Sequence, residues 1–327
     1  MITKKLTADI YNCSIDSEVL TILLMDRSTG TNIRWCTDDY AYLGAGFGNA
    51  DTIEIELVSG MNAGIIKPRA DKEKVHQQQR SREKGEVFTP SWVCNAQNNL
   101  IDNAWFGIER KRFNTEVPNG WVTNYYPISF REAGGKKWED YVMATRLEVS
   151  CGEAPYITSR YDTVSGKYIP VRKRIGLLDR KLRIISENVD DRDKWKHWAI
   201  IALQSIYGYD WQGDNVLLAR KNLIYSVIEA YCDRFSEIVD KNTVLQFAEI
   251  ISWNIWQMDG IKFVVPNTCH QIIKEQIGIF EITQEIEECC GCKTCNPFKH
   301  NGIYCCIKDW RSGETILFAD MLKGAKV

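Results

Sequence analysis

Short strand patterns alternate with long helical patterns between Arg146 and about Pro266, and this alternation restricts the fold more than any other feature of the chain. The runs LEVS, IYGYD and NIWQMD are typical of buried strands. The stretches between them are long and amphipathic or largely apolar, as helices are. Parallel strands need a connection of about a dozen residues or more, which such helices supply. The pattern therefore predicts an α/β domain built on a parallel sheet.

The rest of the chain is expected to form smaller modules on either side of this domain. A chain of 327 residues has room for a core domain of about 200 residues and further modules. Residues 1–66 predict a small β-rich module, because SEVLTILLMDRSTGTNIRWCTDDY and DTIEIELVSG resemble strands around turns. We expect residues 67–268 to form the central domain, with an N-cap Ser91 starting a helix. Residues 269–327 form a cysteine-rich module.

Composition and charge restrict the class of protein. With 44% hydrophobic and 26% charged residues the chain is an ordinary globular protein. It has no apolar run long enough to span a bilayer and no signal-peptide core, so we expect a cytoplasmic protein with no membrane partner. The net charge of −2 argues against general attraction to nucleic acid. Two local segments, 67–84 and 160–181, are rich in Lys and Arg, and each is interpreted either as a solvated surface or as a contact to DNA phosphates.

Acidic residues lie at the ends of the three predicted strands. They are Glu148, before Cys151 and Gly152, then Asp210, and finally Asp259. In open α/β sheets, ligands bind at the carboxyl ends of the strands, where loops and helix N-termini meet. A carboxylate at the end of the second strand is suited to a ribose diol, and a glycine lets a ligand approach the backbone closely. These positions predict a ligand site.

Four blocks in this region carry a resemblance to a known family. GEVFTPSWVCNAQNNLID, RLEVSCGEAPYI, GYDWQGDNVLLARKNLI and WNIWQMDGI resemble, in the family's order, blocks of adenine-N6 DNA methyltransferases, specifically the modification subunits of restriction-modification systems. The resemblance covers roughly residues 85–262. It implies a Rossmann-like methyltransferase sheet, S-adenosylmethionine as cofactor, DNA as substrate, and a restriction or specificity subunit as a possible partner.

The resemblance also implies roles for individual residues. The methionine end of the cofactor would be lined by Phe88, Thr89 and Pro90. The loop around it would consist of Glu148, Cys151 and Gly152. Asp210 would hold the ribose hydroxyls, and Asp259 the adenine amino group.

The sequence departs from the family pattern in two places. The cofactor loop runs Gly152-Glu153-Ala154-Pro155 where the family has a second glycine, and alanine before proline disfavours the positive φ that glycine allows. The family's catalytic tetrapeptide has Asn or Asp, two prolines and an aromatic residue, which hold the flipped base. Here the only candidate for these catalytic residues is the run Asn296, Pro297 and Phe298, which lacks one proline.

Cysteines cluster near the C-terminus. Six of the twelve lie between Cys289 and Cys306, and a dense cluster in a reducing compartment indicates metal before disulfides. The spacing C-x2-C-x4-H-x4-C predicts a closed tetrahedral zinc site. Its expected ligands are Cys292, Cys295, His300 and Cys305. Other cysteines nearby (Cys289, Cys290 and Cys306) leave the ligand set open.

Two functional hypotheses follow. The first is an S-adenosylmethionine-binding protein of the adenine-N6 DNA methyltransferase class, weakly active or inactive as an isolated chain. The second is a catalytically silent, methyltransferase-like protein that binds DNA or a partner subunit. The missing proline favours the second hypothesis, and the acids at positions 210 and 259 favour the first.

Overall fold

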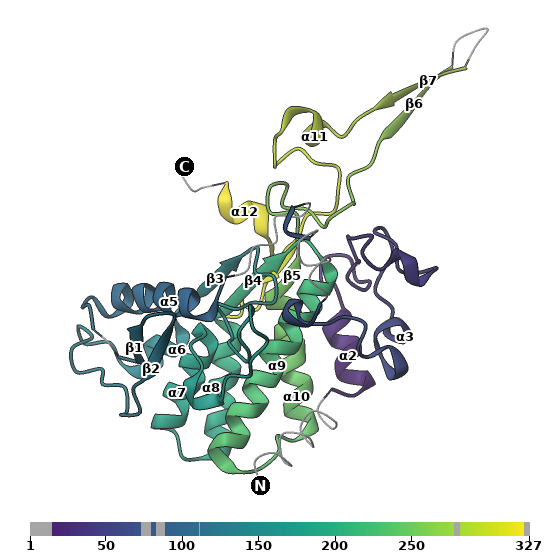
Figure 1. The fold of residues 1–327 in the computed structure, drawn as a ribbon. Helices are drawn as coiled ribbons and strands as arrows, with labels where there is room; N and C mark the ends of the chain where they lie inside the picture. The colour runs from purple at the N-terminus through teal and green to yellow at the C-terminus, as the bar shows by residue number, and fades with distance from the viewer. Residues whose placement is uncertain (1–14, 73–79, 83–88, 111, 278–281, 324–327) are drawn as a thin grey trace.

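The computed structural model describes residues 15–72, 80–82, 89–110, 112–277 and 282–323, and it shows a mixed α/β protein (Figure 1). Its central sheet has three parallel strands, β3 (Arg146–Val149), β4 (Ile206–Asp210) and β5 (Ile255–Gln257), in the order β3-β4-β5. The three strands that the sequence predicts are therefore present and parallel. The sheet is small, because within the described residues β3 and β5 each pair only with β4 and are therefore its two edges.

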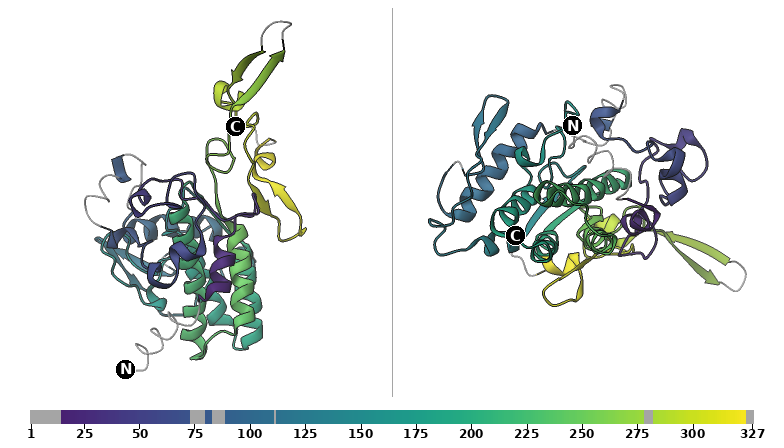
Figure 2. Two further views of the ribbon diagram at one scale, coloured as in Figure 1. Left: turned by 90° about the vertical axis from the view of Figure 1, so that its right-hand side faces the viewer. Right: turned by 90° about the horizontal axis from the view of Figure 1, so that it is seen from below.

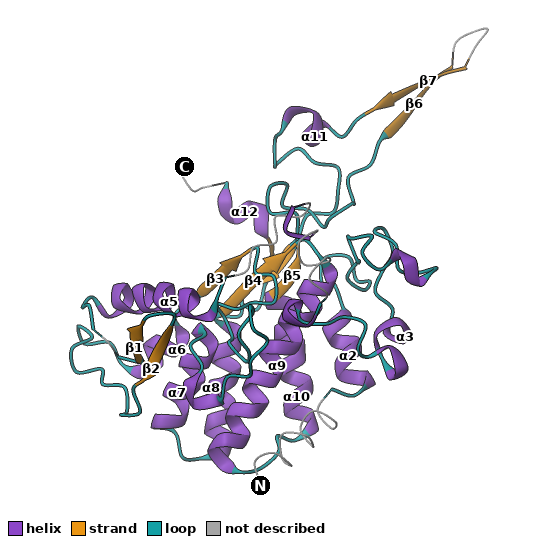
Figure 3. Cartoon of the chain, in the orientation of Figure 1, coloured by secondary structure: helices purple, strands orange, loops and turns teal. Residues whose placement is uncertain are grey.

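Two helices follow each of the first two strands and return the chain to the starting edge of the next strand. α7 (Leu177–Asn188) and α8 (Arg192–Gln204) connect β3 to β4. α9 (Gly213–Phe235) and α10 (Lys241–Asn254) connect β4 to β5. The four helices run side by side along one side of the sheet (Figures 1 and 3).

The ends of these helices follow from local sequence. Asp191 caps α8 by accepting a hydrogen bond from the backbone N–H of Lys194 at 2.9 Å. Asp240 caps α10 in the same way, with the N–H of Thr243 at 3.0 Å. Such side chains satisfy N–H groups that have no partner within the helix. α9 ends at Phe235, and the left-handed conformation (φ +57°) of its C-cap Ser236 turns the chain toward α10.

The central sheet is covered on both faces. Successive side chains of a strand point to opposite faces, and here they enter two different cores. Ile206 and Ile255 are fully buried in the core formed with the helices. Tyr209 and Trp256 point the other way and pack with Phe318 from the C-terminal region. The sheet is thus held between the helices and the C-terminal region.

The C-terminal cover is a small antiparallel pair followed by a short helix. The pair consists of β8 (Cys306–Lys308) and β9 (Thr315–Leu317), and α12 (Phe318–Leu322) follows directly. This cover does not extend fully over the edge strand β3. On the same face of the sheet, Leu147 and Val149 of β3 remain 46% and 60% exposed.

The prediction of a β-rich N-terminal module is wrong. The first expected strand is helix α2 (Ser17–Leu24), and the third, in DTIEIELVSG, includes the short helix α3 (Ile55–Val58). Within the described residues 15–66, β-pairing is limited to two isolated bridges. The same region and the residues just after it form three short 3₁₀ helices, Ala41–Leu43, Gly60–Asn62 and Arg69–Asp71. Residues 19, 20, 23 and 24 are buried, which is the period of a helix rather than a strand.

The N-terminal region shares its core with the α/β domain. Helix α2 packs against α9 and α10, and Leu23 and Leu24 belong to the same continuous cluster of buried side chains as Ile255. Arg220 of α9 reinforces this contact, because its guanidinium donates to the carbonyl oxygens of Leu23 and Met25. The described residues 15–66 therefore contribute to the central core and do not form a separate module.

A second peripheral region surrounds helix α5 (Ser91–Phe106), followed by the hairpin β1 (Asn114–Val117) and β2 (Gly120–Thr123) and by helix α6 (Trp138–Met143). Ser91 is the first residue of α5 and not its N-cap, which is Pro90. The backbone N–H of Ser91 donates to Asp162 at 3.1 Å, so a distant acid does the capping.

The basic insertion between β3 and β4 is largely internal. Four of its seven Lys and Arg residues are buried: Arg160, Arg174, Arg180 and Lys181. Arg160 and Arg174 both pair with Glu229 of α9. A buried charge is stable only when it is paired or hydrogen-bonded, and these groups are. For these four residues, both interpretations, a solvated surface and a contact to DNA phosphates, are therefore wrong.

A hairpin arm projects from the body of the protein (Figure 2). It consists of β6 (Ile272–Ile277) and β7 (Ile282–Glu287), which pair antiparallel, and helix α11 (Cys290–Thr294) follows it. Among all the described residues, no helix combines the length and apolar character that crossing a membrane requires.

Candidate functional site

A cleft of about 1120 Å³ opens at the carboxyl ends of the three parallel strands. Its wall includes six of the eight residues predicted to bind a cofactor: Thr89, Glu148, Cys151, Gly152, Asp210 and Asp259. Phe88 lies outside the described residues, and Pro90 is the N-cap of α5 rather than part of the wall. The carboxyl ends of neighbouring parallel strands meet at one edge, which explains why side chains so distant in sequence converge here.

The loop after β3 has an unusual backbone. Ser150, Gly152 and Ala154 all have positive φ, at +51°, +54° and +61°. We expected Ala154, which precedes a proline, to avoid this conformation, and the structure shows that it does not. A left-handed conformation costs a residue with a side chain about 1–2 kcal/mol, so the surrounding contacts must stabilise the loop.

One contact that holds the loop comes from Glu153. Its carboxylate accepts hydrogen bonds from the backbone N–H of Arg69 and from the hydroxyl of Tyr161, both at 2.5 Å. Asn222 of α9 adds a hydrogen bond to the carbonyl oxygen of Glu153 at 3.1 Å. Glu153 thus fastens the loop to two other segments through its carboxylate.

The carboxylate of Glu148 lies beneath this loop. It accepts hydrogen bonds from the backbone N–H groups of Tyr156 at 3.4 Å and Ile157 at 3.2 Å. The residue as a whole is partly exposed, but its carboxyl group is enclosed by protein. Burial raises the pKa of Glu148 to about 8, against the opposing effect of the two N–H groups.

Asp210 is fixed by backbone at the end of β4. One carboxylate oxygen accepts from the N–H of Gly152 at 2.9 Å, and the other accepts from the N–H of Gln212 at 3.0 Å. Burial raises the pKa of Asp210, and these hydrogen bonds partly oppose the shift. Trp211 follows directly, is 39% exposed and also lines the cleft. Sequence reasoning missed Trp211, although its place after a strand-ending acid is a usable signal.

Asp259 organises the turn after β5. Its Oδ1 accepts from the backbone N–H groups of Ile261 at 2.9 Å and Lys262 at 3.0 Å. Its Oδ2 lies 3.8 Å from the ammonium nitrogen of Lys262. Asp259 therefore lies in the cleft wall, as predicted, but its carboxylate also holds its own turn. Nothing in the sequence pattern singled out Lys262.

The far wall of the cleft carries Thr89 and Tyr156. The carbonyl oxygen of Thr89 accepts a hydrogen bond from the hydroxyl of Thr163 at 2.7 Å, which ties this wall to the insertion after β3. A side chain added at Gly152 would project into open space, since no heavy atom lies within 4 Å of its ideal Cβ position. The cleft thus has free volume directly beside this backbone.

The predicted catalytic residues lie away from the cleft wall. Asn296 accepts a hydrogen bond from the backbone N–H of Phe298 at 2.9 Å, and the carbonyl oxygen of Pro297 accepts from the hydroxyl of Tyr304 at 3.0 Å. The ring of Phe298 is 41% exposed and lies 6.1 Å from that of Phe263. The Asn296 side chain is thus used within its own turn, and none of the three residues lines the cleft.

A second candidate site is a group of cysteine and histidine side chains at the base of the hairpin arm. Its members are Cys269, Cys289, Cys292 and His300, and their ligand atoms all lie within 4.8 Å of one another. It is a group of described residues whose side chains could together hold a metal ion. Cys269 precedes β6, and Cys289 follows β7, so the group closes the base of the arm.

The geometry of this group fits a tetrahedral metal. The three sulfur atoms lie 3.5, 3.6 and 3.6 Å from Nδ1 of His300. With Zn–S of about 2.3 Å and Zn–N of about 2.0–2.1 Å, a tetrahedral angle places sulfur and nitrogen about 3.5–3.6 Å apart. The N–H of Asn301 also donates to Cys289 Sγ at 3.3 Å. Burial raises the pKa of Cys289, but this hydrogen bond and others outweigh that effect and lower the pKa to about 6. The lower pKa favours the thiolate that a metal needs.

The predicted ligand set needs correction at two positions. Cys295 is exposed at the end of α11 and lies outside the group. Cys305 is fully buried and its thiol donates to the carbonyl oxygen of Gln257 at 3.4 Å, so it packs against β5 instead. Cys269 takes part although it lies outside the spacing motif, because the hairpin returns the chain to its start.

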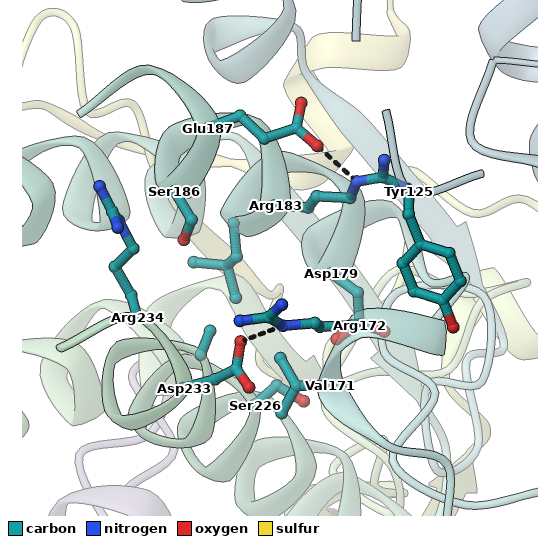
Figure 4. A pocket seen from close by; sticks show the side chains of 12 residues that line it. Tyr125, Val171, Arg172, Asp179, Arg183, Ser186, Glu187, Ser226, Asp233 and Arg234 are labelled. Atoms are coloured by element: carbon teal, nitrogen blue, oxygen red, sulfur yellow. Dashed lines mark hydrogen bonds and ion pairs between the residues drawn. The ribbon is translucent and has the colours of Figure 1, made fainter. Parts of the chain in front are cut away.

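A separate hollow of about 290 Å³ lies between α7, α9 and the segment around Val171 (Figure 4). The arginines drawn there are paired with carboxylates: Arg172 with Asp233 at 3.1 Å, and Arg183 with Glu187 at 2.7 Å. Arg234 pairs with Asp190. These charges stabilise the helices, so we assign no ligand to this hollow.

Comparisons with known proteins give no family for the chain. No family model, no curated protein and no solved structure matches it.

Proposed function

We propose that this chain is an S-adenosylmethionine-binding protein of the adenine-N6 DNA methyltransferase class, of restriction-modification type. The observation that carries the proposal is the convergence of Gly152, Asp210 and Asp259 on one cleft at the ends of three parallel strands. The three strands would be the central part of a Rossmann-like methyltransferase sheet. DNA and a restriction or specificity subunit are the partners that the proposal implies, and we place the protein in the cytoplasm.

The cleft fits the proposed cofactor in shape and polarity. It has open space beside Gly152, an apolar and aromatic wall that includes Trp211, and acidic groups that can accept hydrogen bonds from hydroxyl and amino donors. The carboxylate of Asp210 is already held by two backbone N–H groups, so it is oriented before a ligand arrives. Preorganised acceptors of this kind favour binding.

A second candidate function is supported by the position of the Asn296–Phe298 segment. Transfer to an adenine amino group needs acceptors held beside the methyl donor, because positioning dominates such in-line reactions. The segment engages its own turn and Tyr304. This favours a chain that binds the cofactor but acts as a silent binding protein, or that is weakly active, unless a partner supplies the missing groups.

The second part of the proposal concerns metal. Three sulfur ligands and one imidazole are typical of structural zinc, and we propose zinc as the ion held by Cys269, Cys289, Cys292 and His300. Closed zinc sites contribute folding energy. We expect removal of the zinc to loosen the hairpin arm while the α/β domain stays folded.

Titration calorimetry with S-adenosylmethionine and S-adenosylhomocysteine tests the proposed cofactor. We expect binding that Asp210→Ala weakens by about 1.5–3 kcal/mol, the size of a hydrogen bond to a charged group. Asp320→Ala, at an exposed acid of α12, is the matched control and should leave the affinity unchanged. The absence of heat with both ligands in metal-replete, folded protein would rule out the proposal.

A further inference from the structure

The Cys-His group and the cleft are joined by a short ladder of backbone contacts. Val264 and Tyr304 form an antiparallel bridge. On either side of it, the N–H of Val265 donates to the carbonyl oxygen of Ile303 at 2.8 Å, and the N–H of Cys305 donates to that of Phe263 at 3.0 Å. The first segment of this ladder starts at the cleft residues 259–262 and leads to Cys269, and the second starts at His300.

Asp259 connects the cleft wall to the same ladder through its backbone. Its N–H donates to the carbonyl oxygen of Val264 at 2.9 Å, and its own carbonyl oxygen accepts from the N–H of Phe263 at 2.7 Å. The acid in the cleft and the paired segment are therefore parts of one hydrogen-bonded turn.

We infer that metal in the Cys-His group orders the cleft wall at residues 259–265 and thereby strengthens ligand binding in the cleft. This inference rests on the proposed function for the identity of both ligands. The ladder carries the coupling, since a metal that fixes Cys269 and His300 also fixes the two segments of the ladder between them and the cleft.

The test compares the full chain loaded with Zn²⁺ and the same chain after chelation, using S-adenosylhomocysteine as the probe. Coupling between two sites is typically about 5- to 150-fold in affinity, so we expect the zinc-loaded protein to bind at least about fivefold more tightly. Linkage is reciprocal for binding, and the nucleoside should raise the affinity for Zn²⁺ by the same factor. Competition with a chelator measures that affinity.

Cys269→Ser tests the ladder, because it removes a metal ligand at the end of one of its segments. In the presence of Zn²⁺ we expect this variant to bind S-adenosylhomocysteine as weakly as the chelated protein does. Cys295→Ser is the matched control, because it removes an exposed thiol that lies outside the group. A Cys269 variant that binds the probe as tightly as the zinc-loaded chain would overturn the coupling.

Hydrogen exchange separates failure of this inference from failure of the proposed function. Chelation should increase exchange at the amides of Val265 and Cys305, while the amides of β4 stay protected. Unchanged protection at these two amides, or equal nucleoside affinity with and without metal, overturns the inference. Absence of nucleoside binding in both states overturns the proposed cofactor, and the exchange data then decide whether the metal orders the wall.

Discussion

The carboxylate of Asp210 accepts a hydrogen bond of 2.9 Å from the backbone N–H of Gly152. This contact joins the end of β4 to the loop after β3, so the acid and the glycine position each other. The loop keeps its left-handed conformation at Gly152 and, against the usual preference, at Ser150 and Ala154 as well. The shape of the cleft therefore depends on backbone conformation as much as on side chains.

Gly152→Ala should destabilise the protein by about 1–2 kcal/mol, which is the cost of a left-handed conformation for a residue with a side chain. The added methyl group would meet open space, so the effect comes from the backbone and not from a clash. Urea denaturation measures it. The reverse change, Ser150→Gly, removes an exposed side chain at φ +51° and should stabilise the chain by up to about 1 kcal/mol. Equal stability of all three proteins would contradict this account of the loop.

Glu148 should make stability depend on pH. Burial raises its pKa from 4.5 to about 8, so the folded chain holds a proton that the unfolded chain releases. This contribution is fully present below pH 4.5 and is lost as the pH rises to about 8. The free energy of unfolding should fall across this window, by at most about 1.4 kcal/mol per pH unit.

The comparison with Glu148→Gln isolates this effect, because other buried acids titrate in both proteins. The Gln variant should show a smaller loss of stability between pH 5 and pH 8, measured by denaturation at about one-unit intervals. Parallel stability curves for the two proteins would mean that Glu148 titrates normally.

The metal ligands can be told apart by two serine substitutions. Cys269→Ser should abolish stoichiometric metal, because this thiol completes the group with His300. Cys295→Ser should retain it, since Cys295 is exposed and lies outside the group. Elemental analysis of freshly purified, reduced protein gives the metal content. Loss of metal in the Cys295 variant alone would restore the spacing motif as the true ligand set.

The isolated chain should transfer methyl groups to DNA poorly or not at all. The loss of positioned acceptors typically lowers a rate on the order of 10²–10³ for each group. Tritiated methyl transfer to mixed-sequence DNA measures the activity, with Asn296→Ala as the comparison. Robust incorporation that Asn296→Ala abolishes would mean that the Asn296–Phe298 segment reaches a flipped base in the complex with DNA.

Local sequence determined the central part of the fold and its acidic strand ends. The three parallel strands and helices α7–α10 follow from hydrophobic periodicity and caps such as Asp191 and Asp240, which act within a few residues of their position. Acids at the ends of parallel strands must lie at one edge, so Glu148, Asp210 and Asp259 could be placed together before any coordinates.

The N-terminal error shows where local pattern is ambiguous. The run SEVLTILL contains β-branched residues that favour a strand, but its burial on α9 and α10 follows the period of a helix. Tertiary packing decided between the two, because an apolar segment adopts the conformation that buries its face best. The same holds for Arg160 and Arg174, whose charges are paired by Glu229 on a distant helix.

Tertiary structure alone decided the metal group and the position of the Asn296–Phe298 segment. Cys269 and His300 are 31 residues apart and meet because the arm between them folds back on itself. A spacing motif counts residues along the chain, whereas a tetrahedral site requires atoms within a few ångströms in space. The path of the chain between two residues sets that distance, and this path depends on packing that no short motif contains.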